Sequence, residues 1–169
     1  MSEIVTFTID GKRISAEAGQ TILAAAQACG IYIPRLCHKD GLTPVGGCRV
    51  CTVRVNGRPA SACTQPVAAG IVVDNDTEEL RAWRRQIIEG LLGADLVGFQ
   101  TPAGAQNFLR LVRKRTDNRV ERYRVFVKDS HVCAARAYPI SIDVQGFHDL
   151  AQSPEVKAES EALLEELGH

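Results

Sequence analysis

Apolar and polar residues alternate near the start of the chain, which is the pattern of half-buried β-strands. Residues 4–9 read IVTFTI, and a second alternating stretch follows at residues 13–17. Asp10-Gly11 lies between the two stretches, and this dipeptide is typical of a two-residue hairpin turn. The chain is therefore predicted to open with a β-hairpin.

A helical period replaces the alternation at residues 19–30, GQTILAAAQACG. Apolar side chains recur at helical spacing, and Gly30 is placed to end the helix in a left-handed conformation. We expect the buried face of this helix to consist of Ile22, Ala25, Ala26 and Cys29. Cys29 is thus interpreted as a small buried apolar residue and not as a spare metal ligand.

Strand patterns return after a cysteine-rich loop. CTVRV at residues 51–55 alternates, Asn56-Gly57 is a second hairpin signal, and PASACTQPV and GIVV supply further strand material. Over residues 1–75 the predicted order is strand, strand, helix, loop, strand, strand, strand. This order favours a small mixed sheet with one helix packed across it, in the α+β class.

A domain boundary is expected near Asp74, and residues 76–169 are predicted to be a mainly helical extension. Asp76 and Glu79 are expected to form a capping box for a helix that runs to about Leu92. Its predicted apolar side consists of Leu80, Trp83, Ile87, Ile88 and Leu91.

Two further helices are expected in this extension. Thr101-Pro102 is a good cap and first-turn pair for a helix through Val112, and Ser153-Pro154 begins another that ends at Gly168. A short strand is predicted at residues 140–144, ISIDV.

Composition restricts the compartment and the partners. The 169 residues include 20 acidic and 20 basic ones, so no net charge points to nucleic acid or to a membrane surface. The N-terminus lacks a secretory pattern, and no apolar run approaches the roughly 18 residues of a membrane span. We therefore expect a cytoplasmic protein without direct membrane insertion. In a reducing compartment, clustered cysteines more often bind metal or do redox chemistry than form disulfides.

Four of the six cysteines lie within LCHKDGLTPVGGCRVCTVRVNGRPASAC, residues 36–63. Their spacing is Cys37-x10-Cys48-x2-Cys51-x11-Cys63. A structural zinc site usually takes two short C-x2-C or C-x2-H pairs, whereas here only the middle two cysteines are paired in this way. A two-iron two-sulfur cluster fits the spacing better, because each iron takes two thiolates and a long loop can enclose the cluster. Zinc and a disulfide remain the alternatives.

The glycines of this loop support the cluster. Gly41, Gly46 and Gly47 allow unusual backbone conformations that bring amide hydrogens toward the sulfurs. Such amides stabilise an anionic cluster and raise its reduction potential.

The segment GIYIPRLCHKDGLTPVGGCRVCTVRVNGRPASACTQPV resembles the N-terminal ferredoxin-type domain of the complex I 75 kDa subunit and of its relatives in NAD-linked hydrogenases and formate dehydrogenases. The resemblance covers about residues 3–75. It implies a β-grasp 2Fe-2S ferredoxin-like fold over residues 1–75 and one-electron transfer. It also implies a 2Fe-2S cluster on four ligands, Cys37, Cys48, Cys51 and Cys63.

The same family usually continues with one histidine and three cysteines that bind a four-iron cluster. RRQIIEGLLG is similar to the lead-in of that segment and AGAQNFLRL to its end, yet residues 93–110 contain neither cysteine nor histidine. The resemblance implies that the scaffold remains while the second cluster is lost. We therefore expect a protein with one cluster.

Three further features are given structural interpretations. Cys133, with His131 two residues before it, is expected to pack as an ordinary apolar residue, because two ligands do not make a metal site. His38 is expected either to tune the cluster by hydrogen bonding or to lie in the loop as a surface residue. The basic segment 110–124 is interpreted as a solvated helix face or a docking surface for an acidic partner.

These features favour an electron-transfer subunit of a multi-subunit cytoplasmic oxidoreductase, of the NAD-linked hydrogenase or formate dehydrogenase type. The expected partner is a flavin- or iron-sulfur-containing subunit in a hetero-oligomer, with residues 76–169 as the docking region and no role for nucleic acid. No catalytic residue is identified, so enzymatic activity of the chain's own stays open. The alternatives are a free-standing ferredoxin serving an oxygenase or reductase, and a zinc-binding or redox-sensing module.

Overall fold

The computed structural model describes residues 3–128, 130–139 and 143–168. Residues 1–138 form one compact unit and residues 139–169 a second one, and each is described by itself. The first unit contains two sheets, each with its own hydrophobic core.

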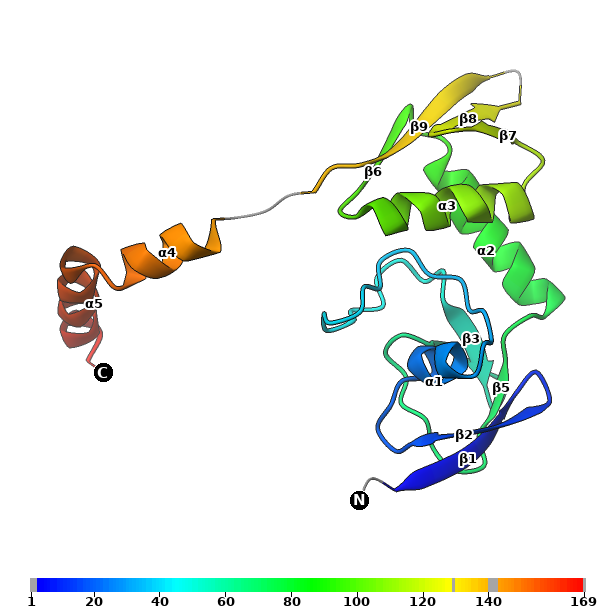
Figure 1. Ribbon diagram of the computed structural model, residues 1–169, viewed down its shortest axis with the longest axis horizontal. Coiled ribbons are helices and arrows are strands. Elements are labelled where there is room, and N and C mark those ends of the chain that lie inside the picture. Colours follow the sequence, from blue (N-terminus) through cyan, green and yellow to red (C-terminus); the bar gives the residue numbers. More distant parts are fainter. Residues whose placement is uncertain (1–2, 129, 140–142, 169) are drawn as a thin grey trace. The chain divides into compact units, whose positions relative to one another are not determined.

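The first sheet confirms the order of elements predicted for residues 1–75. Its strands lie in the order β2-β1-β5-β3-β4, and the central pair β1 and β5 is parallel while the other pairs are antiparallel (Figure 1). The α+β class is thereby confirmed. The elements are β1 (Ile4–Ile9), β2 (Lys12–Glu17), α1 (Ile22–Ala28), β3 (Thr52–Val55), β4 (Arg58–Ser61) and β5 (Val72–Asp74).

Helix α1 packs its apolar face into the core of this sheet. The Thr21 side chain caps the helix by accepting a hydrogen bond from the Ala24 amide at 3.2 Å. The buried residues of helix and sheet include Ile22, Leu23, Ala26, Phe7, Ile9, Val53 and Val73. The prediction for Cys29 is wrong: the helix ends at Ala28, and Cys29 is the exposed residue at its C-terminal cap.

The second sheet was missed by the prediction of a mainly helical extension. Its four strands lie in the order β6-β9-β8-β7, with β6 and β9 parallel. Helix α3 packs against this sheet and against α2 (Figure 1). The elements are α2 (Glu78–Leu91), β6 (Leu96–Phe99), α3 (Pro102–Arg115), β7 (Arg119–Glu121), β8 (Arg124–Val127) and β9 (His131–Ala137).

The two cores are joined by residues of the cysteine loop: Val50 lies within the second core, and Leu36 and Cys48 pack against it. Val50 is fully buried, and it packs in the second core although its neighbour Cys51 packs in the first. The second core otherwise consists of residues from α2, α3 and the second sheet, including Ile88, Leu92, Phe108, Leu111, Val112, Val125 and Cys133.

Helix α2 differs from its prediction in two respects. Its N-cap is Thr77, whose side chain accepts from the Leu80 amide, because Asp76 instead pairs with Arg81. Trp83 is 40% exposed, and Arg84 lies on the buried face between Leu80 and Ile88.

The second unit contains α4 (Val144–Ala151) and α5 (Pro154–Leu167). Helix α5 begins after Ser153 and ends at the left-handed Gly168, as predicted. The strand predicted at 140–144 lies largely outside the described residues; of its described part, Asp143 caps α4 and Val144 begins that helix. Among all described residues, no helix is both long and apolar enough to cross a membrane.

Candidate metal centre

Four cysteines meet where the long loop after α1 runs into the first sheet. Cys37 and Cys48 belong to the loop, Cys51 directly precedes β3, and Cys63 follows β4. The antiparallel pairing of β3 with β4 places Thr52 opposite Ser61, so the sheet itself brings the last two thiols together. Cys51 and Cys63 are buried, Cys48 is half-buried and Cys37 is exposed.

The thiols are arranged as two interacting pairs. The side chains of Cys37 and Cys48 are in hydrogen-bond contact, and so are those of Cys51 and Cys63. Burial, and then the neighbouring thiol of Cys51, raise the pKa of Cys63 to about 12. The Cys37 and Cys63 thiols also sense each other's charge, so the two pairs form one electrostatic group.

Backbone amides donate hydrogen bonds to the sulfur of the half-buried Cys48. Burial works against ionisation of Cys48, but hydrogen bonds from the backbone of Cys37, Val50 and Leu36, together with the Cys37 side chain, outweigh it and lower the pKa of Cys48. Burial is the largest influence on Cys37 and raises its pKa. The loop thus stabilises a thiolate at Cys48, and a thiolate is the form that binds metal.

This arrangement fits a two-iron cluster better than a single ion. Each iron of a 2Fe-2S cluster takes two thiolates, which is what the two pairs offer. The residues present therefore fit the 2Fe-2S group.

The loop backbone adopts the conformations that its glycines permit. Gly46 has φ of +66°, and a Cβ at this position would lie 3.3 Å from both Ser61 Oγ and Thr64 Cγ2. Arg49, between Cys48 and Cys51, also has a positive φ of 56°, and its Nη1 donates to Ser61 Oγ at 2.9 Å. The sequence offered no signal for Arg49, because a non-glycine residue with positive φ is uncommon.

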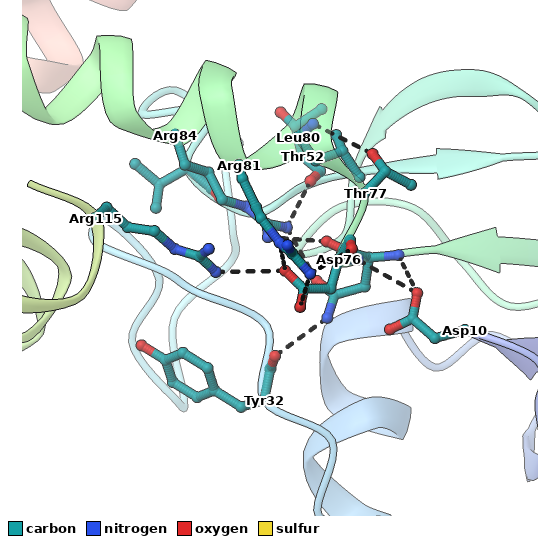
Figure 2. Close-up of polar contacts among 11 residues, drawn as sticks. Asp10, Tyr32, Thr52, Asp76, Thr77, Leu80, Arg81, Arg84 and Arg115 are labelled. Atoms are coloured by element: carbon teal, nitrogen blue, oxygen red, sulfur yellow. Dashed lines mark hydrogen bonds and ion pairs between the residues drawn. The ribbon is translucent and has the colours of Figure 1, made fainter.

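A buried arginine holds the carbonyls on both sides of Cys51. Arg84 of α2 donates from Nε to the Val50 carbonyl at 3.2 Å and from Nη2 to the Thr52 carbonyl at 3.0 Å (Figure 2). It also donates to the backbone carbonyl and the side-chain oxygen of Asn75, both at 2.9 Å. The sequence analysis missed Arg84 because it placed Trp83 on the buried face of the helix. The available signal was the spacing of Arg84, which is four residues from both Leu80 and Ile88.

The other histidine and cysteine candidates do not join the four thiols. His38 Nδ1 lies 3.3 Å from Arg35 Nη1; burial, and then this guanidinium, lower the pKa of His38, while Asp40 opposes them. Cys133 is fully buried in the second core, as its structural interpretation required. His131 Nε2 instead lies 2.9 Å from the Leu92 carbonyl oxygen.

The basic segment 110–124 is not one helix face. Helix α3 ends at Arg115, and the remaining residues form a short connection, β7, the turn after it and the first residue of β8. Several of its arginines lie over aromatic rings or pair with acids: Arg119 lies 4.0 Å from the ring centre of Phe126, and Arg115 lies 3.5 Å from Asp76.

The fold and the thiol loop of the N-terminal part define its class, a 2Fe-2S ferredoxin-type domain. Residues 2–78 match the family described as a 2Fe-2S iron-sulfur cluster binding domain. Residues 77–169 match another family, glycosyltransferase family 20. The two matches meet at residues 77–78, where β5 has ended and α2 begins.

Relatives of the ferredoxin-type part are oxidoreductase subunits. The chain is 41% identical over 90 residues to the NADH-ubiquinone oxidoreductase 78 kDa subunit of Candida albicans, covering 52% of this chain and 12% of that protein. It is 41% identical over 87 residues to the NAD-reducing hydrogenase HoxS subunit gamma of Cupriavidus necator, covering 52% and 37%. A crystal structure of NAD+-reducing NiFe-hydrogenase in the H2-reduced state is similar with a TM-score of 0.50 and 41% identity, covering 52% of this chain and 37% of that one.

A relative of a different kind accompanies the second family. The chain is 41% identical over 95 residues to the trehalose-6-phosphate synthase of Mycobacterium sp. strain KMS, covering 52% of this chain and 19% of that protein. The chain thus spans little more than a third, or less, of the length of each of these curated relatives.

The chain belongs to glycosyltransferase family 20 through residues 77–169, more than half of its length, and joins this segment to the 2Fe-2S domain of the complex I and NAD-reducing hydrogenase family. The resemblance proposed for residues 1–75 and the 2Fe-2S cofactor are confirmed. Residues 93–110, interpreted above as a four-iron segment without its ligands, lie inside the glycosyltransferase match, and that interpretation stays a prediction.

Proposed function

We propose that the chain transfers one electron at a time through a single 2Fe-2S cluster held by Cys37, Cys48, Cys51 and Cys63. The observation that carries this proposal is the arrangement of the four thiols in two pairs at the end of the first sheet. When bound, such a cluster supplies the one-electron redox couple. The protein's own residues supply the thiolates, the backbone amides at Cys48 and the burial of Cys51 and Cys63.

The exposed side of the site determines where electrons would pass. Cys37 is exposed and Cys48 half-buried, whereas the other two sulfurs are enclosed by the first core. Electron exchange would therefore occur at the Cys37 side of the loop. Two apolar side chains there face solvent, Leu42 at 66% and Val45 at 82% exposure, and they are suited to contact a partner.

The proposed setting is a cytoplasmic hetero-oligomeric oxidoreductase of the NAD-linked hydrogenase or formate dehydrogenase type. Its support is the identity of 41% to a subunit of an NAD-reducing hydrogenase. The partner would carry a flavin or an iron-sulfur cluster, and residues 76–169 would serve as the docking region. A pocket lined by Arg110, Arg113, Lys114 and Arg122 supports a partner with an acidic surface.

The cluster is tested by anaerobic purification of the full chain, followed by iron and sulfide analysis and paramagnetic resonance of the reduced protein. We expect two irons and two sulfides per chain and a signal that appears on one-electron reduction. Stoichiometric zinc without a reducible chromophore would overturn the proposal. Size-exclusion chromatography of a native extract tests the setting, since a chain that elutes alone near its own mass contradicts the subunit assignment.

The glycosyltransferase match favours a second candidate function, a contribution to glycosyl transfer of the kind named for trehalose-6-phosphate synthase. The chain would be incubated with nucleotide-activated glucose and glucose 6-phosphate, and trehalose 6-phosphate would be assayed. Product above that of the heat-denatured chain supports this function. Absence of both product and calorimetric binding of the sugar nucleotide contradicts it.

A further inference from the structure

Arg84 is a buried cation without a carboxylate partner. It is the largest of the fully buried side chains of the described residues, with 1% of its surface exposed. Its four hydrogen bonds go to uncharged oxygens of Val50, Thr52 and Asn75. Burial, followed by the charge of Arg115, lowers the pKa of Arg84 to about 10, so the side chain is charged at neutral pH. A buried charge is costly unless an opposite charge compensates it.

The nearby carboxylates are occupied by other groups. Asp76 pairs with Arg81 at 2.9 Å and with Arg115 at 3.5 Å (Figure 2). Asp10 accepts hydrogen bonds from the backbone amides of Asn75 and Asp76, at 2.7 and 3.3 Å. Arg81, Arg84 and Arg115 carry three positive charges. Asp10 and Asp76 carry two negative charges. This cluster of side chains is therefore left with a positive charge beside the cysteine loop.

The thiol site offers the missing negative charge. The two carbonyls that Arg84 holds flank Cys51, and the charge of the Cys51 sulfur, after that of Asp76, favours the charged form of Arg84. In a 2Fe-2S cluster the four thiolates and two sulfides outweigh the charge of the irons, so the group is an anion. One-electron reduction converts one ferric iron to ferrous iron without breaking a bond, and makes this anion more negative.

We propose that the Arg84 guanidinium is the internal counter-ion of the cluster and a positioning residue for the Cys51 segment, and that it raises the reduction potential. The inference rests on the proposed electron-transfer function. A fixed cation stabilises the more negative reduced state over the oxidised state, and low polarisability around a buried site strengthens this difference. Arg84 lies in the segment matched to glycosyltransferase family 20, so the second part of the chain contributes to the redox site of the first.

The test is a spectroscopic redox titration of the full cluster-loaded chain, with dithionite as reductant. Arg84→Gln removes the charge, and Arg84→Lys keeps it while losing the planar fork. Arg85→Gln is the matched control, because Arg85 is the exposed neighbour on the same helix. Iron and sulfide content, visible circular dichroism and paramagnetic resonance of each variant are recorded before the titration.

For Arg84→Gln we expect at least a tenfold lower ratio of reduced to oxidised cluster at a given potential, equivalent to about 59 mV for a one-electron couple. Arg84→Lys should retain most of the wild-type ratio, and Arg85→Gln should change it by less than about twofold because an exposed charge is screened. An unchanged potential in a loaded Arg84→Gln variant overturns the inference.

The lysine variant keeps the inference testable if Arg84→Gln does not fold. A loaded Arg84→Lys variant with near wild-type potential then supports the counter-ion, because lysine keeps the positive charge but lacks the planar fork that holds the two carbonyls. If the ratio of reduced to oxidised cluster in Arg84→Lys falls tenfold, the result contradicts the counter-ion role. Failure of the proposed function itself would be seen separately, as wild-type chain that takes up no iron and sulfide.

Discussion

The two cores of residues 3–138 are built from similar parts but treat their cysteines differently. The first packs one helix on a five-stranded sheet and carries four thiols at the end of that sheet. The second consists of a four-stranded sheet, α3 packed on it and α2 packed on α3; it buries the thiol of Cys133, and the half-buried Cys48 packs against it. Cys63 and Cys133 are equally buried, so burial does not distinguish a ligand from a packing residue. The difference is the neighbouring thiol, which only the loop and the β3–β4 pair provide.

The largest expected effect is therefore loss of the cluster when one thiol of a pair is removed. Cys51→Ser should abolish or grossly alter the visible and paramagnetic resonance signals, because Cys51 pairs with Cys63 and one iron would lose a sulfur ligand. Cys133→Ala is the control from the other core and should leave both signals intact. A lost signal in Cys133→Ala, or a native signal in Cys51→Ser, would show that the ligand set is wrong.

The next effect concerns the packing of the second core. Phe108 is fully buried and its ring centre lies 5.4 Å from that of Phe99. Phe108→Ala should lower the free energy of unfolding by about 3–5 kcal/mol, because a large cavity remains. Denaturant unfolding followed by Trp83 fluorescence measures this change. The iron and sulfide content of the folded variant should stay at the wild-type value, since Cys51 and Cys63 are buried in the other core and Cys48 is only partly buried against the core of Phe108.

The first region was more predictable from sequence than the second, because its turns and strands have local sequence signals. In the first region the turns Asp10-Gly11 and Asn56-Gly57 and the alternating strands are local signals, and the structure has a positive φ at all four of these turn residues. The second sheet lacks such signals. Strand β7 reads RVE and β8 begins with Arg124, so their charged residues suggested an exposed helix. Their strand state depends on pairing with β9, which is a tertiary effect.

The sequence indicated the four cysteines of the candidate site but not the residues that support them. The spacing of the cysteines and the glycines indicated a cluster, whereas Arg84 belongs to a residue type that is almost never fully buried unless paired. Its acceptors are carbonyls of Val50, Thr52 and Asn75, which only the folded chain brings together. Likewise, the short helical patterns within residues 77–169 did not indicate the family that these residues match.

A smaller effect is expected from strain in the cysteine loop. Gly46→Ala places a Cβ 3.3 Å from Ser61 Oγ in a left-handed conformation, and should cost about 1–2 kcal/mol of unfolding free energy. Gly70→Ala is the control, since Gly70 has φ of +73° with open space around its Cβ position. Visible circular dichroism of the cluster should change only in Gly46→Ala. Equal changes in both variants would contradict a close contact at Gly46.

The smallest effect tests whether the two cores unfold together. Thr21 caps α1 in the first core and Thr101 caps α3 in the second, and each side chain accepts from a backbone amide three residues later at 3.2 Å. Thr21→Ala and Thr101→Ala should each cost about 1 kcal/mol. Unfolding is followed by two probes, cluster absorption for the first core and hydrogen exchange of the Val125 amide for the second, since Val125 is buried there.

Because Val50 of the cysteine loop is buried in the second core, we expect one cooperative transition for residues 3–138. Each threonine variant should then shift both probes by the same amount. If Thr21→Ala moves the cluster absorption alone and Thr101→Ala moves the hydrogen exchange of Val125 alone, the cores are separate folding units. In that case Val50 packs across the boundary without coupling the two parts, and Arg84 would have to hold the Cys51 segment from a helix that unfolds independently of it.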